Sequence, residues 1–249
     1  MNKIFILKIM RKPVLSFLFA LLFYSGLSAQ YESAIKSAII NLDFYEEEIC
    51  ATANRFKQNP REVMAVVFPE MIRYNLVKDF FETSALELIY ANLGSREVDF
   101  SIGIFQMKPS FIEKLEDIII QNPAVFSEYL FVAKYDVSDE QSVRHERLRR
   151  LKSSKWQILY AFTFYAVADA CFWAEDFCTP QERTAFYAAA YNLGFDAKIS
   201  SIRNWAPVKA FPYGRKFDGV QLSYAQLAVD YYDKYFTTIS CPGVLSSTP

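Results

Sequence analysis

The chain repeats its apolar residues at the spacing of an α-helix along much of its length. Between residues 31 and 56 these residues include Ile35, Ala38, Ile39 and Leu42, and the same three- and four-residue spacing returns in most later segments. The alternation of apolar and polar residues that is typical of a strand does not persist anywhere. We find no internal repeat and no low-complexity linker. The sequence therefore predicts an all-α fold with a single domain over residues 30–241.

Proline and glycine residues divide this pattern into separate helices. Pro109 suits the first turn of a helix, and Gly94 is a suitable residue to end one. Pro69 falls inside a predicted helix, where it removes a backbone hydrogen bond and should bend the axis. We expect a disordered tail over residues 242–249. The predicted helices span residues 31–56, 61–74, 79–93, 109–119, 125–131, 139–151, 155–175, 180–194 and 224–235.

The first 29 residues have the pattern of a signal peptide. Four bases precede an apolar run from Val14 to Tyr24, and small residues up to Ala29 offer a cleavage site. The run is shorter than the roughly 20 residues that a membrane-spanning helix needs. We therefore expect cleavage after Ala29 and a periplasmic or secreted domain, with an uncleaved anchor as the alternative.

The charge of the predicted mature chain argues against a nucleic-acid partner. It has 23 lysines and arginines against 28 acids, a formal charge of −5, and no basic stripe. The one dense basic stretch, from Arg144 to Arg150, alternates with Glu146. We interpret it as a solvated helix face, and contact with an anionic polymer is the alternative.

Four cysteines follow the predicted leader, which is an even number in a chain expected to be exported. They allow two disulfides in three connectivities. Cys171 and Cys178 can pair only if a helix ends between them, since seven helical residues rise by about 10 Å. The cysteine spacings fit no usual zinc site, and His145 is the only histidine, which argues against Ser-His or Cys-His catalysis. We expect neither a metal nor a cofactor.

One acid lies in unusually apolar company. Glu70 follows the run from Val66 to Pro69 and precedes Met71 and Ile72. Burial disfavours the ionised form of a carboxyl group and raises its pKa, which suits a general acid working near neutral pH. The alternative is that Glu70 points outward and pairs with a nearby arginine, Arg73 or Arg61.

Three segments together resemble the lytic transglycosylases of the lysozyme-like superfamily. They are V-M-A-V-V-F-P-E-M-I-R-Y at residues 63–74, S-I-G-I-F-Q-M-K-P-S at residues 101–110, and A-A-A-Y-N-L-G at residues 188–194. F-P-Y-G at residues 211–214 and the last tyrosine-rich helix also look like that family's ending. The resemblance covers roughly residues 61–235. It implies a single lysozyme-like helical domain with Glu70 as the catalytic acid.

Two departures from the family's pattern concern the surroundings of this glutamate. Met71 stands where the family usually has serine, and Gln106 follows Glu70 by 36 residues, which is longer than the family leads us to expect. The helix predicted at residues 79–93 accounts for the extra length. It also brings Glu82 and Glu87, either of which could be taken for the catalyst.

The resemblance assigns roles to the residues around Gly103. It implies that Gly103 lets the backbone approach the saccharide, because a side chain there would block it. Ser101 and Gln106 would form hydrogen bonds with N-acetyl or hydroxyl groups of the substrate, and Met107 would shape the floor of the cleft. The alternative from the residues alone is that Gly103 only forms a turn.

The third segment supplies two further candidates. By resemblance, the hydroxyl of Tyr191 lies beside the catalytic carboxyl, and Asn192 braces the loop that holds Gly103. From the residues alone, both could simply close a helix. Asp99 is a candidate second carboxylate, although a short polar turn explains it equally well.

The implied reaction is cleavage of the β-1,4 bond between N-acetylmuramic acid and N-acetylglucosamine, with Glu70 as general acid and then base. The muramoyl C6 hydroxyl would close a 1,6-anhydro ring, so the partner is the glycan strand of peptidoglycan. The alternatives are a hydrolytic muramidase with a second carboxylate and a non-catalytic domain that binds glycan or scaffolds an envelope protein assembly. We expect a monomer. Tyr165, Trp173 and Trp205 are further candidates to line a cleft.

Overall fold

The fold is all-α, as the sequence predicts. The computed structural model describes residues 30–77, 84–219, 221–234 and 241, so the predicted leader and tail lie outside the described residues. Within these ranges no helix is long and apolar enough to cross a membrane. The helices comprise residues 30–44, α2 (Glu46–Phe56), α3 (Pro60–Val77), α4 (Ser84–Leu93), α5 (Pro109–Gln121), α6 (Glu140–Leu151), α7 (Ser154–Cys171), α8 (Pro180–Leu193), α9 (Ile199–Trp205) and α10 (Tyr224–Lys234).

Several predicted boundaries and elements are wrong. The segment predicted as a helix at residues 125–131 forms only a short 3-10 turn, η2 (Ser127–Tyr129). The first predicted helix is interrupted at Tyr45, and α7 ends at Cys171 rather than at residue 175. The sequence analysis also missed α9 and a small antiparallel hairpin of β1 (Lys209–Phe211) and β2 (Leu222–Ser223).

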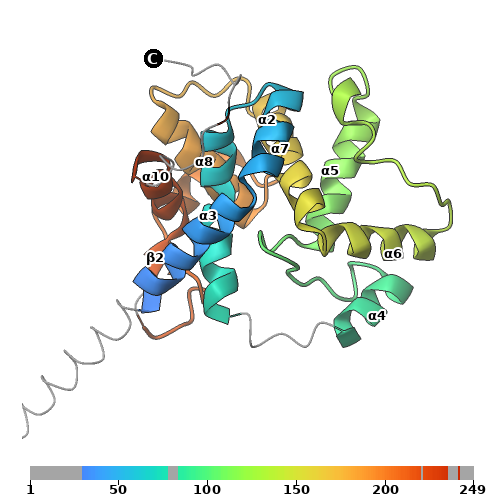
Figure 1. Ribbon diagram of the computed structural model, residues 1–249, viewed down its shortest axis with the longest axis horizontal. Helices are drawn as coiled ribbons and strands as arrows, with labels where there is room; N and C mark the ends of the chain where they lie inside the picture. Colours follow the sequence, from blue (N-terminus) through green and yellow to red (C-terminus); the bar gives the residue numbers. More distant parts are fainter. Residues whose placement is uncertain (1–29, 78–83, 220, 235–240, 242–249) are drawn as a thin grey trace, which may run out of the picture.

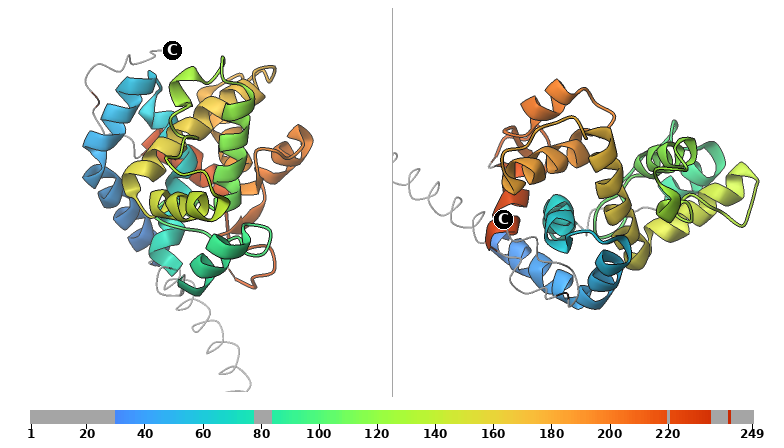
Figure 2. Two further views of the ribbon diagram at one scale, coloured as in Figure 1. Left: turned by 90° about the vertical axis from the view of Figure 1, so that its right-hand side faces the viewer. Right: turned by 90° about the horizontal axis from the view of Figure 1, so that it is seen from above.

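Helix α3 is the centre of the main helical layer. It packs against α2, α7, α8 and α10, and the right-hand view of Figure 2 shows it end-on inside a ring of these helices. Its residues from Glu62 to Ile72 are buried on every side of the helix. A helix that is surrounded in this way must be apolar all round. The two acids in this stretch, Glu62 and Glu70, are therefore inside the protein.

Helices α4, α5 and α6 form a second group beside this ring (Figure 1). Helix α6 packs against α4, α5 and α7. The interpretation of its basic stretch as a solvated face is wrong for two arginines. Arg147 forms ion pairs with Glu113 and Glu116 of α5, and Arg150 donates to the carbonyls of Val132 and Lys134; both arginines are buried.

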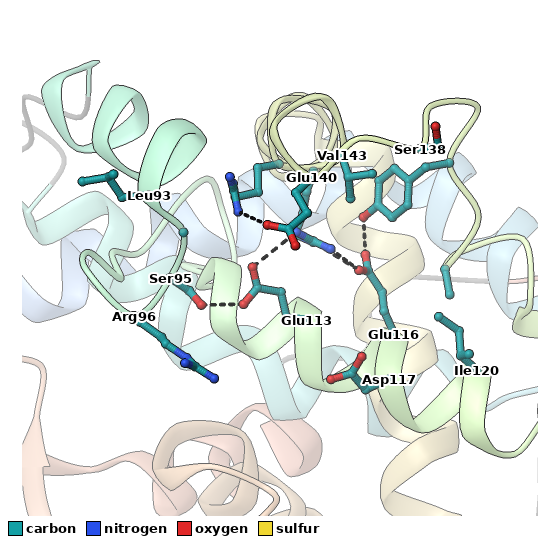
Figure 3. Close-up of a pocket in the computed structure, with 15 residues that line it drawn as sticks. Leu93, Ser95, Arg96, Glu113, Glu116, Asp117, Ile120, Ser138, Glu140 and Val143 are labelled. Atoms are coloured by element: carbon teal, nitrogen blue, oxygen red, sulfur yellow. Dashed lines mark hydrogen bonds and ion pairs between the residues drawn. The ribbon is translucent and has the colours of Figure 1, made fainter.

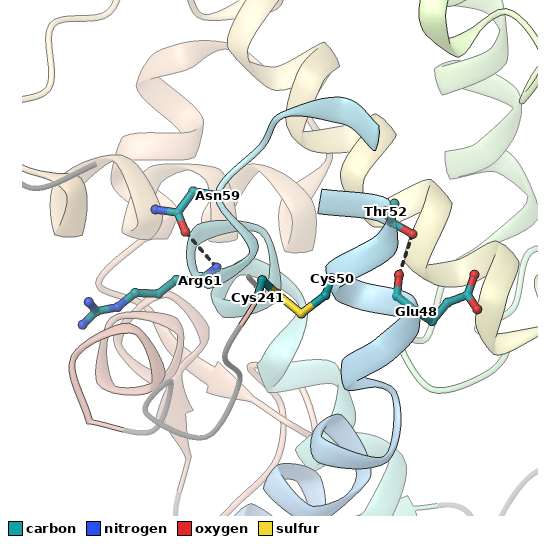
Figure 4. The surroundings of a disulfide bond; sticks show 6 residues. All are labelled: Glu48, Cys50, Thr52, Asn59, Arg61 and Cys241. Atoms are coloured by element: carbon teal, nitrogen blue, oxygen red, sulfur yellow. Dashed lines mark hydrogen bonds between the residues drawn. A yellow bond between two sulfur atoms is a disulfide. The ribbon is translucent and has the colours of Figure 1, made fainter. Parts of the chain in front are cut away.

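A disulfide joins the two ends of the domain. Cys50 of α2 is bonded to Cys241, which lies 191 residues further along the chain (Figure 4). Cys171 and Cys178 are free and exposed. Helix α7 does end at Cys171, as their pairing would require, but the structure leaves the two thiols unbridged.

Candidate active site

Glu70 lies in the second half of α3 and is 4% exposed. The burial of its carboxyl group raises its pKa to about 7. The charge of Arg73, the side chain of Asn192 and the charge of Lys108 act in the opposite direction and limit this rise. Near neutral pH the carboxyl group therefore exists in both protonation states, as a group that gives and then takes a proton requires.

One oxygen of this carboxyl group is left without a hydrogen-bond partner. Oε2 of Glu70 is buried and has no partner among the described residues. The nearest cation is Nη1 of Arg73, one turn further along α3, at 3.7 Å, which is beyond hydrogen-bonding distance. Buried polar atoms in folded proteins are usually paired. Oε2 therefore has hydrogen-bonding capacity that the described residues do not use.

Two buried tyrosines lie near Glu70. The pKa of Tyr191 and that of Tyr224 are raised well above the ordinary value by burial and, to a lesser extent, by the charge of Glu70. Tyr191 donates a hydrogen bond to the carbonyl of Phe105 at 2.8 Å, and Tyr224 donates to the carbonyl of Val66 at 3.2 Å. Tyr191 thus joins α8 to the 101–107 segment, and Tyr224 joins α10 to α3 one turn before Glu70.

The segment predicted to bind substrate forms a tight turn. Ile102 and Met107 pair through two backbone hydrogen bonds, and the chain reverses between them. Gly103 has a φ of 70°, in the left-handed region that favours glycine. A Cβ at Gly103 would lie 1.6 Å from Nε2 of Gln157. The position needs glycine because Gln157 fills that space, which is an internal reason and differs from the approach of a saccharide that we expected.

Gln157 of α7 holds this turn from inside the protein. Its side-chain amide donates to the carbonyl of Ile102 at 2.9 Å and to that of Leu151, and its oxygen accepts a hydrogen bond from the backbone N–H of Phe105 at 2.7 Å. The sequence analysis missed this residue. A lone amide within the apolar run W-Q-I-L-Y-A-F at residues 156–162 was the signal that could have revealed it.

Gln106 has features that suit a binding residue. It adopts a φ of 49°, which is unusual for a residue other than glycine, and its Nε2 donates to the carbonyl of Gly103 at 2.8 Å. Its Oε1 is buried without a partner. Ser101 is half-buried, and its hydroxyl has no hydrogen bond to the described residues, whereas Met107 is fully buried. Gln106 and Ser101 therefore retain hydrogen-bonding capacity.

A pocket of about 120 Å³ opens beside the neighbours of Glu70. Its lining includes Arg73, Asn192, Trp205, Tyr224 and residues of the 208–214 segment, which contains β1. The side chain of Asn192 accepts a hydrogen bond from Nε1 of Trp205 at 2.9 Å. The hydrogen bond from this end of α8 to the glycine loop comes from Tyr191, whereas Asn192 holds Trp205 in the wall of the pocket. The role of Asn192 as a brace of the glycine loop stays a prediction.

The other candidate carboxylates have partners elsewhere. Asp99 accepts hydrogen bonds from the backbone N–H and the hydroxyl of Ser110, at the start of α5, which is the polar turn that we considered for it. Glu87 of α4 pairs with Lys152 at 2.5 Å. Glu82 lies outside the described residues. Of the aromatic candidates, Trp205 lines the pocket and Tyr165 is buried.

Neither a metal site among the described residues nor a similar known protein indicates the reaction. The described residues hold no group of histidines, cysteines or acids that could bind a metal ion. No protein-family model, curated protein or solved structure matches the chain. The chemistry of the site must therefore be argued from Glu70 and its neighbours.

Proposed function

We propose that this protein is an exported lytic transglycosylase that cleaves the glycan strands of peptidoglycan, with Glu70 as its acid and base. The observation that carries the proposal is the state of Glu70: a buried carboxyl group with a pKa of about 7 and one oxygen without a partner. The lysozyme-like arrangement implied by the sequence resemblance is part of the same proposal. A central α3 with the acid in its second half is consistent with it.

The first step is proton donation. At neutral pH a large fraction of Glu70 is protonated, and Oε2 gives its proton to the oxygen of the glycosidic bond. The bond from this oxygen to C1 of the muramoyl unit breaks, and the N-acetylglucosamine unit leaves with a free 4-hydroxyl group. Tyr191 and Tyr224 are occupied by backbone carbonyls and keep their protons at this pH, since their pKa values are raised. Glu70 is thus the proton donor of the site.

The second step uses the same carboxylate as a base. Once it has lost its proton, Glu70 removes one from the C6 hydroxyl of the muramoyl unit, which closes a 1,6-anhydro ring and leaves the enzyme protonated again. The charges of Arg73 and Lys108 stabilise the carboxylate between the two steps. A single acid suffices for this cycle, whereas hydrolysis by inversion needs a second carboxylate to position water.

The Asn192 pocket, lined by Arg73, Asn192, Trp205, β1 and Tyr224, would hold one part of a sugar unit. Its volume of about 120 Å³ is below the usual 300–1,000 Å³ of small-molecule sites. We therefore assign it one ring substituent, such as an acetamido group, and place the rest of the strand on the open surface. The unpaired Oε1 of Gln106 would accept a hydrogen bond from an N–H group of the substrate.

The test is digestion of purified peptidoglycan, with the products analysed by mass spectrometry. We expect 1,6-anhydromuramoyl ends from the wild type, and a loss on the order of 10²–10⁴-fold in rate with Glu70→Gln. Glu87→Gln is the matched control, because it removes a carboxylate that pairs with Lys152. Asp99→Asn tests the alternative carboxylate, which pairs with Lys108.

Three outcomes would contradict the proposal. Reducing ends, heavier by one water, would show a muramidase. Activity that survives in Glu70→Gln and disappears in Asp99→Asn would show a different catalyst. Binding of glycan without any cleavage by the folded wild type would favour a scaffold domain.

A further inference from the structure

A second pocket lies apart from Glu70, between the end of α4, one face of α5 and the start of α6. We call it the α5–α6 pocket; its volume is about 680 Å³, within the usual range for a small-molecule site (Figure 3). Its walls are polar and charged, and they include Arg96, Glu113, Asp117, Glu140 and Arg147.

The floor of the pocket is formed by side chains that bind one another through ion pairs and hydrogen bonds. Arg147 forms ion pairs with Glu116 at 2.6 Å and with Glu113 at 3.3 Å, and it also donates to the hydroxyl of Tyr90 at 2.8 Å. Glu113 also accepts hydrogen bonds from Tyr90 and Ser95. These contacts fix the carboxylate of Glu113 in one orientation. The charge of Arg147 is balanced by the two glutamates.

The rim differs from the floor because two of its charges have no partner. Arg96 follows the end of α4 and Asp117 lies on α5; both are exposed, and neither side chain forms a hydrogen bond or ion pair with the described residues. Figure 3 shows Arg96 extending toward the side of the pocket where Asp117 lies, with Glu113 between them. Glu113 and Asp117 are one turn apart on the same face of α5. Among the described residues, the pocket thus offers one unpaired cation, Arg96, and two carboxylates on one face of α5, of which Asp117 is unpaired.

This arrangement fits a ligand that carries both charges. An ammonium group would lie against Asp117 and the remaining lone pair of Glu113, and a carboxylate would pair with the guanidinium of Arg96. An anion alone would be repelled by the two acids, and a cation alone would leave Arg96 unused. The matching chemical class is a zwitterionic amino-acid or peptide end.

The same face of α5 leads from this pocket toward Glu70. Ser110, Glu113 and Asp117 follow each other at helical spacing, and Ser110 is bound to Asp99 near the Lys108 that acts on Glu70. Nine residues separate Lys108 from Asp117, a helical rise of about 13 Å. An extended peptide of five residues spans about 16–18 Å. The path along α5 from Lys108, a cation that acts on Glu70, to Asp117 in the pocket is therefore within the length of a short extended peptide.

We propose that the α5–α6 pocket binds the zwitterionic part of a peptide stem whose glycan lies at Glu70, through Arg96 on the carboxylate and Asp117 with Glu113 on the ammonium group. This inference rests on the proposed function for the identity of the ligand. The stem of peptidoglycan offers such a group when its diamino acid is diaminopimelate, which carries an amine and a carboxylate on one side-chain carbon.

The test measures binding of a free stem peptide to the purified protein by calorimetry, so that it does not depend on cleavage. The probe is L-Ala-γ-D-Glu-diaminopimelyl-D-Ala, compared with the same peptide amidated at the side-chain carboxylate or acetylated at the side-chain amine. We expect each modification to weaken binding on the order of tenfold. Arg96→Gln should weaken binding of the free peptide similarly and remove the effect of amidation, and Asp117→Asn should do the same for acetylation.

Control variants exclude a general effect of surface charge. Arg149→Gln and Asp176→Asn remove exposed charges that do not line the pocket, and they should bind as the wild type does. Binding that is insensitive to both peptide modifications, or equal weakening by the control variants, would overturn the proposal. So would an absence of binding by a wild type that cleaves glycan.

A cleavage arm separates this proposal from the proposed function. Strands with intact stems should be cleaved with a KM raised several-fold in Arg96→Gln, whereas strands stripped of their stems should be cleaved equally by variant and wild type. If the peptide binds with the expected pattern and no strand is cleaved, the proposal for the α5–α6 pocket is supported. The proposal that Glu70 is a catalyst is then contradicted.

Discussion

Two acids on one helix differ in how their burial is compensated. Glu62 and Glu70 lie eight residues apart on α3, and each is 4% exposed. The carboxylate of Glu62 accepts hydrogen bonds from Asn59 at 3.2 Å, from Tyr165 and from Arg183. Oε2 of Glu70 has none. Both oxygens of the first acid thus accept hydrogen bonds and join α3, α7 and α8, whereas one oxygen of the second accepts none.

The two acids show which property separates a structural acid from a functional one. Burial alone does not do so, because both residues are equally buried. Glu70 differs because one of its oxygens has no hydrogen-bond partner among the described residues. The cations that act on it, Arg73 and Lys108, form no close hydrogen bond with that oxygen. A polar atom buried without a partner costs stability, so its retention points to a use outside folding.

Replacing Glu70 should change the free energy of unfolding by an amount that depends on pH. The folded pKa of about 7 lies above the unfolded value near 4.5. Between these values the folded state keeps a proton that the unfolded state has lost, so stability falls as the pH rises through this window. Glu70→Gln should lack this loss. Its stability relative to the wild type should increase by about 3 kcal/mol from pH 4 to pH 8.

Urea unfolding at pH 4, 6 and 8 measures this directly. Glu128→Gln, which removes an exposed carboxylate, serves as the surface control. A constant difference between Glu70→Gln and the wild type at all three pH values would mean that Glu70 titrates normally. The burial of Glu70 and its unpaired oxygen would then have no effect on its pKa.

The opposite result is expected at Glu62. Glu62→Gln weakens the hydrogen bonds from Tyr165 and Arg183 and leaves a guanidinium next to a neutral group. We expect a loss of about 2–3 kcal/mol in the free energy of unfolding at pH 7, measured by urea unfolding. Glycan cleavage per folded molecule should stay unchanged. If Glu62→Gln abolished cleavage without destabilising the protein, the roles of the two acids would have to be exchanged.

The sequence predicts the helices well because their signals are local. Helical spacing, Pro109 at a first turn and Gly94 past a last turn all act within a few residues, and α5 and α4 begin or end where they indicate. The same local signals fail where contacts with distant parts of the chain determine whether a segment forms a helix. Residues 125–131 are apolar enough for a helix but form only a 3-10 turn, and α9 is too short to show a period.

The candidate site was predictable only in part, for the same reason. The burial of Glu70 follows from its apolar neighbours, so the sequence indicates it. The contacts of Gly103 and Asn192 come from residues far away in the chain, Gln157 on α7 and Trp205 on α9. Neither partner can be identified from spacing. The burial of Arg147 likewise depends on two glutamates of α5 that no pattern in α6 reveals.

The smallest effect concerns the cations around Glu70. Arg73 lowers the pKa of Glu70 more than Lys108 does, although it is 34% exposed and its contact is long. Arg73→Gln removes a charge that favours the ionised form, so the pKa of Glu70 should rise, and Lys108→Gln should raise it less. Carbon-13 NMR of the Glu70 carboxyl group measures both shifts without requiring activity. If cleavage depends on protonated Glu70, the alkaline limb of kcat/KM should move to higher pH in the same order. A carboxyl titration that both variants leave unmoved would show that solvent screens these cations, and that burial alone sets the proton affinity of Glu70.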